Sequence, residues 1–139
     1  MIEYGKQQVV SRVNSILTIT YWQIGKKIND YILKNERAEY GGKVVINLAK
    51  DLEKQFGRSY TLRNVRRMIQ FAEQFDDLQI VTSLMTQLSW THFLELFPLK
   101  TKESKLFYAN KIINEKWSVR QTKFQIKRKA FERKEIASL

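Results

Sequence analysis

Residues 43–75 read KVVINLAKDLEKQFGRSYTLRNVRRMIQFAEQF. Apolar residues recur every three or four positions on either side of a single glycine: Val45, Leu48, Leu52 and Phe56, then Leu62, Val65, Ile69, Ala72 and Phe75. This spacing gathers each series on one face of a helix. Gly57 ends the first helix, and Ser59 or Thr61 can cap the second by accepting a backbone N–H. The stretch therefore predicts two amphipathic helices arranged like a helix-turn-helix.

The same spacing extends toward the N-terminus. Seven apolar residues follow one another at intervals of three or four: Val10, Val13, Leu17, Tyr21, Ile24, Ile28 and Ile32. They predict one long opening helix with an apolar face turned to a core. We expect this helix to stop near Gly41 and Gly42, because glycine weakens a helix.

Downstream of this stretch, the pattern of residues 78–88 is weak and fits only a loop or a short helix. Ser89 can cap a short, aromatic-rich helix over residues 90–97. Pro98 stops that helix, because the proline ring and the missing N–H oppose continuation.

Thr101 can start the next helix. Ser118 and Gln121 then form a capping box, which opens a last helix expected to run to the terminus. Only five glycines and one proline occur, and no strand alternation stands out. The sequence therefore predicts an all-α fold: a single compact domain of about six helices over residues 1–139, with an embedded helix-turn-helix-like pair.

The composition narrows the chemistry. Cysteine is absent, which excludes disulfides, thiolate nucleophiles and cysteine-bound zinc. No apolar run approaches the roughly 18 residues that a membrane span needs, and the N-terminus lacks the pattern of a signal peptide. We therefore expect a cytoplasmic protein that binds no membrane and needs no cofactor.

The charge of the chain points to a partner. The formal net charge is +11, and residues 101–139 carry 11 Lys or Arg against four Asp or Glu. Lys and Arg side chains that neutralise phosphates release condensed counterions, so a basic surface favours a polyanion. The charge predicts a nucleic-acid partner without indicating any sequence specificity.

The second helix of the quoted stretch carries four polar residues expected to lie opposite the core: Arg63, Asn64, Arg67 and Gln70. In a helix-turn-helix the second helix enters the major groove, where Arg can donate two hydrogen bonds to guanine. These residues are therefore candidate DNA contacts. An ordinary helical hairpin with a solvated polar face fits the same pattern.

The last predicted helix has a basic stripe. Arg120, Lys123, Lys127 and Lys134 recur at spacings of 3, 4 and 7. Such residues can hold phosphates, which positions a protein without reading sequence, although a solvated face is the alternative. Four apolar residues of the same segment can pack against another chain or a further domain: Ile126, Ala130, Phe131 and Ile136.

His92 is the only histidine and lies in an aromatic stretch. Metal binding or acid-base chemistry normally needs partner residues, and none can be named for it. We expect His92 to pack or to make a structural hydrogen bond. Trp22, Trp90 and Trp117 each fall in a periodic apolar segment and are expected to anchor the core.

No constellation in the sequence predicts catalysis. Acidic residues do precede lysines by two positions, as in Glu103–Lys105 and Glu132–Lys134, but on predicted helices. Nucleases of the PD-(D/E)xK class hold their carboxylates on neighbouring strands, so that both reach one magnesium ion. A phosphate-cradling glycine loop and a Ser-His-Asp set are also missing. We expect no catalytic and no metal-binding residue.

Six short segments follow one another in a familiar order. They are YWQIGKKI at 21–28, YG at 40–41, LAKDL at 48–52, LRNV at 62–65, QLSWTH at 87–92, and FY at 107–108 through WSVR at 117–120. Together they resemble the N-terminal domain of the YhcG family, from about Val10 to Ile126. The family's recurring Arg63-Asn64 and Trp90-Thr91-His92 elements carry no catalytic role to transfer.

The resemblance implies that full-length bacterial members join this helical domain to a C-terminal PD-(D/E)xK nuclease domain expected to act on DNA. We expect any nuclease activity to belong to that domain, the present chain being a fragment or a truncated gene product. The resulting hypothesis is a non-catalytic module that binds or targets DNA, most simply double-stranded DNA. The alternative is a protein-interaction module, in which the opening helix and the apolar face of the last helix mediate homodimerisation or docking to the nuclease domain.

Overall fold

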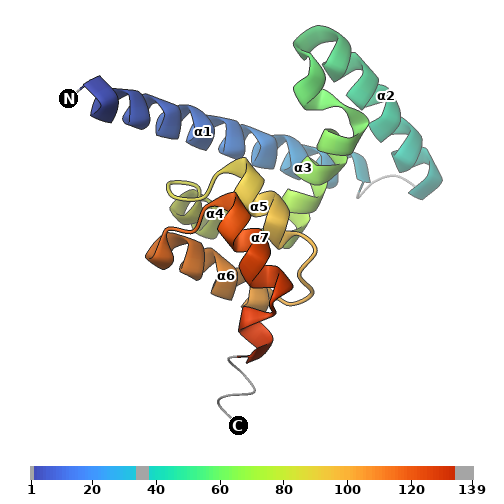
Figure 1. Cartoon of the computed structure of the whole chain (residues 1–139). Helices are drawn as coiled ribbons and strands as arrows, with labels where there is room; N and C mark the ends of the chain where they lie inside the picture. The colour runs from blue at the N-terminus through green and yellow to red at the C-terminus, as the bar shows by residue number, and fades with distance from the viewer. Residues whose placement is uncertain (1, 34–37, 134–139) are drawn as a thin grey trace. The chain divides into compact units, whose positions relative to one another are not determined.

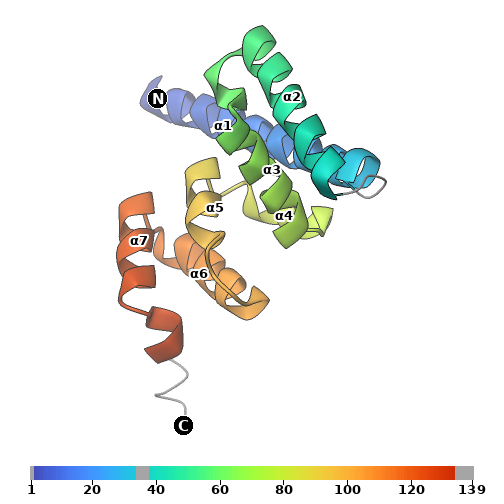
Figure 2. The ribbon, with the colours of Figure 1, turned by 90° about the vertical axis from the view of Figure 1, so that its right-hand side faces the viewer.

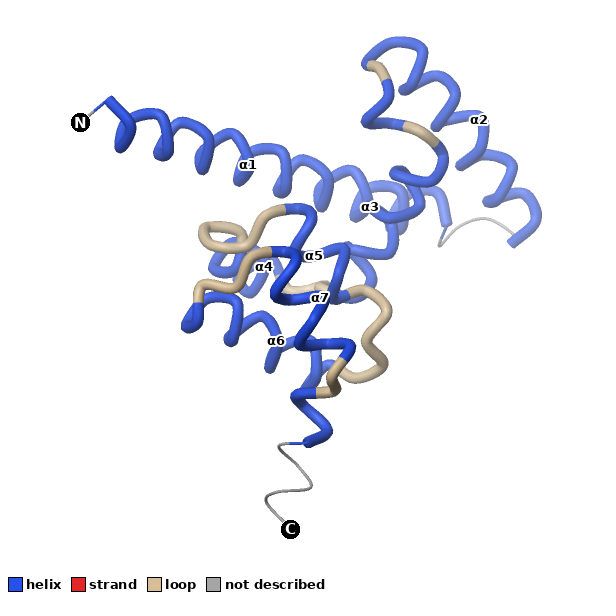
Figure 3. Tube along the Cα trace, in the orientation of Figure 1, coloured by secondary structure: helices blue, strands red, loops and turns tan. Residues whose placement is uncertain are grey.

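The computed structural model describes residues 2–33 and 38–133, with side chains described at 14–31 and 41–133. Every regular element in these ranges is helical, which confirms the predicted all-α fold (Figures 1 and 3). Seven α-helices occur there, with a π-helical segment after the first and a 3-10 turn after the second. They are α1 (Ile2–Lys27), the π-helical segment (Ile28–Leu33), α2 (Ala38–Phe56), the 3-10 turn (Arg58–Tyr60), α3 (Leu62–Gln74), α4 (Leu78–Leu84), α5 (Trp90–Leu96), α6 (Lys102–Glu115) and α7 (Val119–Lys127).

The chain forms two compact units. One consists of Leu17–Leu78 and is called the α2–α3 unit here; the other joins Met1–Ile16 to Gln79–Leu139 and is called the α4–α7 unit. Helix α1 contributes its second half to the first unit and its first half to the second.

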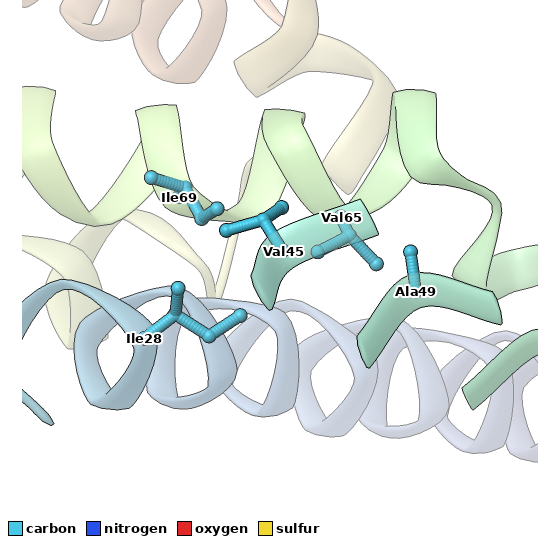
Figure 4. Close-up of a cluster of buried hydrophobic side chains, with 5 residues drawn as sticks. All are labelled: Ile28, Val45, Ala49, Val65 and Ile69. Carbon is cyan, nitrogen blue, oxygen red and sulfur yellow. The ribbon is translucent and has the colours of Figure 1, made fainter. Parts of the chain in front are cut away.

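The core of the α2–α3 unit contains most of the apolar residues that the spacing predicted, but the predicted Leu17 and Phe56 are 42% and 66% exposed. Five buried side chains meet from three elements (Figure 4): Ile28, Val45, Ala49, Val65 and Ile69. Leu48, Leu52 and Leu62 pack against this cluster and are partly buried. Burying such side chains stabilises a fold by roughly 1.5 to 3 kcal/mol each, so this cluster holds α2 and α3 together.

Helix α1 approaches α3 closely, because Gly25 has no side chain. A Cβ built on Gly25 would overlap the backbone carbonyl group of Met68. Two hydrogen bonds fix the same contact: Trp22 Nε1 donates to the Phe75 carbonyl at 2.7 Å, and Asn29 Nδ2 donates to the Ile69 carbonyl at 3.2 Å. Trp22 is buried, as predicted for a core anchor.

The turn between α2 and α3 follows the predicted breaks. Gly57 ends α2 with φ at +98°, a left-handed conformation that favours glycine. Thr61 caps α3, its hydroxyl oxygen accepting the Asn64 N–H at 3.3 Å. Figure 2 shows α2 and α3 lying against each other on either side of this turn.

One predicted boundary is wrong. Helix α2 begins at Ala38, so Gly41 and Gly42 lie inside it and do not end the opening helix. Glycine costs a helix only about 0.5 to 1 kcal/mol relative to alanine, and the packing of Val45 and Ala49 outweighs that cost. The side chains of Val10, Val13 and Ile32, which belong to the predicted apolar face, lie outside the described residues.

In the α4–α7 unit the predicted caps are confirmed. The hydroxyl oxygens of Ser89, Thr101 and Ser118 accept the backbone N–H three residues onward, and α5, α6 and α7 begin after them. The weakly patterned segment forms the short helix α4. The side chains buried most deeply come from four helices and the α4–α5 loop: Val81, Leu88, Phe93, Leu96, Tyr108 and Thr122.

The last helix does not continue to the terminus. Helix α7 ends at Lys127, and Lys129 then adopts φ of +59°, which a right-handed helix does not allow. A further helical turn follows over residues 130–133, in which Phe131 packs its ring on Phe107 at 5.3 Å. Lys134 and Ile136, predicted for this helix, lie outside the described residues.

Candidate nucleic-acid interface

The exposed face of α3 consists of four polar side chains: Arg63, Arg66, Gln70 and Glu73. They are spaced by 3, 4 and 3 residues, so they form one stripe along the helix. The opposite side is apolar and buried, with Val65, Met68 and Ile69 among its residues. We call these four residues the α3 face; it carries two cations, Arg63 and Arg66, and one acid, Glu73.

Two of the predicted contacts on α3 are less exposed than this stripe. Asn64 and Arg67 are only half-exposed, and Arg67 Nη1 donates to Asn64 Oδ1 at 3.3 Å. Asn64 follows Arg63 by one residue and is therefore turned about 100° away from it. The prediction that Asn64 lies opposite the core is wrong for this reason. Arg66 was not among the predicted contacts, although its spacing of three residues from Arg63 and four from Gln70 places it on the same stripe.

Helix α7 carries a denser positive charge. The exposed side chains of this helix and its C-cap residue Arg128 include the three predicted cations and two further residues: Arg120, Lys123, Lys127, Arg128 and Phe124. The ring of Phe124 is 59% exposed, and the Arg128 guanidinium carbon lies 5.9 Å from its centroid. No Asp or Glu occurs from Val119 to Arg128. We call these five residues the α7 face.

One acid from a neighbouring helix touches the α7 face. Lys123 Nζ lies 3.5 Å from Glu95 Oε1 of α5, with the Lys123 side chain 62% exposed. An ion pair this exposed is weak, so the Lys123 ammonium group can still bind an anion.

Polar contacts at its N-terminus define where α7 begins. Gln121 Oε1 accepts the Ser118 N–H at 2.8 Å while Ser118 Oγ accepts the Gln121 N–H at 3.1 Å, which completes the predicted capping box. The buried Thr122 hydroxyl donates to the Ser118 carbonyl at 2.9 Å.

His92 connects α5 to the start of α7. Its Nδ1 accepts the Ser89 N–H at 3.1 Å, so the ring proton lies on Nε2, which donates to the Trp117 carbonyl at 2.9 Å. Burial lowers the pKa of His92, although the Trp117 carbonyl and Glu95 oppose that shift. The neutral ring fits both contacts, and the predicted structural hydrogen bond is confirmed.

A hollow of about 370 Å³ opens beside α7 in the α4–α7 unit. Its lining combines aromatic, amide and cationic side chains: Phe107, Lys111, Trp117, Gln125, Ala130 and Arg133. Trp117 and Trp90 are half-buried, so they anchor the core less fully than predicted. Phe131, proposed to face a partner, instead packs inward, and its N–H donates to the Tyr108 hydroxyl at 3.2 Å.

A second buried titratable side chain serves the fold. The buried Lys105 donates to the Leu99 carbonyl, and desolvation lowers its pKa. Within the ranges that the structure describes, no three His, Asp or Glu side chains gather closely enough to hold a metal ion. None of the helices in the same ranges has both the length and the apolar character of a membrane-crossing helix.

Comparison with known proteins identifies relatives. The profile of the family described as "DUF1016 N-terminal domain" matches residues 1–133. The Escherichia coli (strain K12) protein named "Putative nuclease YhcG" is 24% identical over an alignment 163 residues long, which covers 96% of this chain and 44% of that protein. The chain thus spans less than half the length of this relative. No solved structure matches.

Proposed function

The chain belongs to the DUF1016 N-terminal domain family, and from this premise we propose that it is a non-catalytic module by which a nuclease protein binds DNA. The relative named as a nuclease is more than twice as long as the matched region. In this proposal the nuclease reaction belongs to the remainder of such a protein, and the helical domain brings it to its substrate.

The observation that carries this proposal is the charge of the α7 face. Four cations, Arg120, Lys123, Lys127 and Arg128, lie exposed on a helix without acidic residues. Each phosphate that a cation neutralises contributes about −0.9 to the slope of log K against log salt for duplex DNA. Four such contacts correspond to a slope of about −3.6. The α7 face is therefore proposed to hold the phosphate backbone.

The α3 face is proposed as a second contact with DNA. Arg63, Arg66 and Gln70 are the side chains of α3 that can reach base edges or phosphates, in the manner of a recognition helix. Asn64 and Arg67 hold each other and are proposed to brace the start of this helix. Arg63 and Gln70 thus stay candidate contacts from the sequence analysis, joined by Arg66.

Fluorescence anisotropy with a labelled random-sequence duplex tests the proposal. The chain is titrated across a salt series, beside the double variant Arg120→Ala/Lys127→Ala. We expect wild-type affinity to fall steeply with salt. In the variant, affinity at low salt drops by about tenfold and the salt slope becomes shallower by about 1.8, because two phosphate contacts are lost.

The matched control removes two lysines outside α7. Lys100→Ala/Lys102→Ala lowers the net charge equally, and both side chains are exposed. It should change the affinity by less than about twofold, since only the long-range field is altered. Equal losses in both double variants, or undetectable duplex binding at low salt, would overturn duplex binding through α7.

A second candidate function is a protein-interaction module. Two adjacent apolar side chains of α1, Ile16 and Leu17, are 62% and 42% exposed. Burying such residues between two copies of the chain is favourable. Sedimentation equilibrium of the wild type and of Ile16→Ser/Leu17→Ser distinguishes this function: a dimer that dissociates in the variant and ignores DNA would favour it.

A further inference from the structure

Phe124 is an exposed aromatic residue in a cationic setting. On the helix surface its neighbours four residues before, three after and four after are Arg120, Lys127 and Arg128. All three are exposed, and the Arg128 guanidinium carbon lies 5.9 Å from the ring centroid. Phe124 is 59% exposed, because it lies on the side of α7 opposite the buried Thr122.

This combination suits one kind of ligand. Proteins that bind single-stranded nucleic acid place aromatic rings, on which bases stack, within a positively charged surface that follows the backbone. In a duplex the bases are stacked on each other inside the helix, so a protruding phenyl ring gains nothing from them. A surface made only for duplex phosphates has no use for Phe124.

The hollow beside α7 continues the same chemistry. Gln125, the residue after Phe124, lines it together with the Phe107 and Trp117 rings and the Lys111 and Arg133 cations. Aromatic faces offer stacking, and an amide can donate to or accept from the edge of an unpaired base. A strand that leaves Phe124 on this side meets more surface of the same type.

We propose that the α7 face binds single-stranded nucleic acid, with an unpaired base stacked on Phe124 and the flanking phosphates on Arg120, Lys127 and Arg128. This inference rests on the proposed function and narrows it: the domain directs its nuclease to ends, gaps or other unpaired regions. An acidic protein partner would use Phe124 as an apolar contact, which leucine can largely replace, whereas stacking of a base requires the aromatic ring.

The test compares a labelled 15-nucleotide thymidine strand with a blunt duplex hairpin of similar length. Binding is measured for the wild type and for Phe124→Ala, Phe124→Leu and Phe124→Trp. We expect Phe124→Ala and Phe124→Leu to lower single-strand affinity by at least about fivefold, while duplex affinity changes by less than twofold. Phe124→Trp should bind the single strand at least as well as the wild type.

Phe56→Ala is the matched control, because Phe56 is a similarly exposed phenylalanine, 66% exposed, that belongs to α2 and not to α7. It should leave both affinities unchanged. Thermal unfolding should show that none of the Phe124 variants loses its fold, since the side chain is mostly solvated.

Each outcome decides the matter. If Phe124→Leu binds the single strand like the wild type, the ring is not a stacking platform and the surface fits a protein partner. Equal effects of Phe124→Ala on single strand and duplex also refute the inference. If duplex binding depends on Arg120 and Lys127 while Phe124→Ala changes neither affinity, the inference is refuted but the proposed function stands. If neither DNA binds, the proposed function is refuted as well.

Discussion

The α3 face and the α7 face are both basic, but their surroundings differ. On α3, Arg63 and Arg66 share the exposed stripe with Gln70 and the acidic Glu73. On α7 the exposed cations have no acid on their own helix. Because the attraction of DNA phosphates depends on the local excess of positive charge, α7 is expected to contribute more to affinity. The resemblance to a helix-turn-helix motif thus points to α3 as the main DNA contact, whereas the density of positive charge points to α7.

The two faces are also supported differently. Helix α3 is positioned by close packing: Gly25 lets the α1 backbone approach Met68, and Val65 and Ile69 fill the core. Helix α7 begins at the Ser118–Gln121 capping box, and the Trp117 carbonyl just before it accepts a hydrogen bond from His92 Nε2 of α5. Packing in a dense interior tolerates little change of volume, whereas polar contacts can be exchanged or titrated. Substitutions in the packed contact of α3 should therefore destabilise the protein more than substitutions in the hydrogen bonds of α7.

The largest effect is expected for Gly25→Ala, which targets the support of α3. The added methyl group overlaps the Met68 carbonyl, so α1 and α3 have to move apart. We expect the free energy of unfolding to fall by about 3 kcal/mol or more. Thermal and urea denaturation followed by circular dichroism measure this change.

Gly42→Ala is the control for that substitution. A Cβ at Gly42 meets nothing within 4 Å, and the residue lies in α2. This variant should be more stable than the wild type by about 0.5 to 1 kcal/mol. If Gly25→Ala were as stable as Gly42→Ala, the close approach of α1 to α3 would be wrong.

The next effect concerns the support of α7. His92→Ala removes the bonds to the Ser89 N–H and the Trp117 carbonyl, so the free energy of unfolding should fall by about 2 kcal/mol. His92→Gln should lose less, since glutamine at this position can form the capping box that Gln121 forms with Ser118. Equal losses in the two variants would show that the cap adds nothing.

The same residue makes stability depend on pH. Burial lowers the pKa of His92 in the folded state, so below the unfolded value of 6.5 the unfolded chain binds more protons. Stability from this group is complete above that pH and declines as the pH falls toward the folded pKa. Urea denaturation at pH 7 and pH 5 should show a decline in the wild type that is smaller in His92→Gln.

Much of the fold could be predicted because helix spacing and caps are local features. Ser89, Thr101 and Ser118 cap helices where expected, and Val45, Val65 and Ile69 are buried as their spacing requires. The early start of α2 before Gly41 and Gly42 was missed because tertiary packing overrides a weak helix propensity.

The candidate site was less predictable for a physical reason. Whether a side chain faces outward depends on how its helix is rotated against the core, which the residue type does not encode. Phe124 is apolar, as core residues usually are, and yet it is exposed, whereas Asn64 is polar and half-buried. The left-handed backbone of Lys129, a residue that rarely adopts it, also has no local signal.

A smaller effect separates the two faces in binding. Arg63→Ala/Arg66→Ala should weaken duplex binding by about threefold, against about tenfold for Arg120→Ala/Lys127→Ala, because Glu73 already offsets part of the charge on α3. Both double variants remove two cations, so anisotropy under identical salt compares them directly. A larger loss of duplex affinity in Arg63→Ala/Arg66→Ala would favour α3 as the principal DNA contact and support the helix-turn-helix interpretation.

The smallest effect is expected at Glu95, the acid that touches the α7 face. Glu95→Gln removes the ion pair with Lys123, whose side chain is 62% exposed. Stability should change by no more than about 0.5 kcal/mol, because exposed pairs contribute little. Duplex affinity should rise by about twofold, since one more cation is available and one repelling carboxylate is lost.

Glu73→Gln is the matched change on the α3 face, and it should raise affinity less if α7 is the main contact. A larger gain from Glu73→Gln would contradict the difference between the two faces, because removing an acid has most effect where the phosphates lie closest.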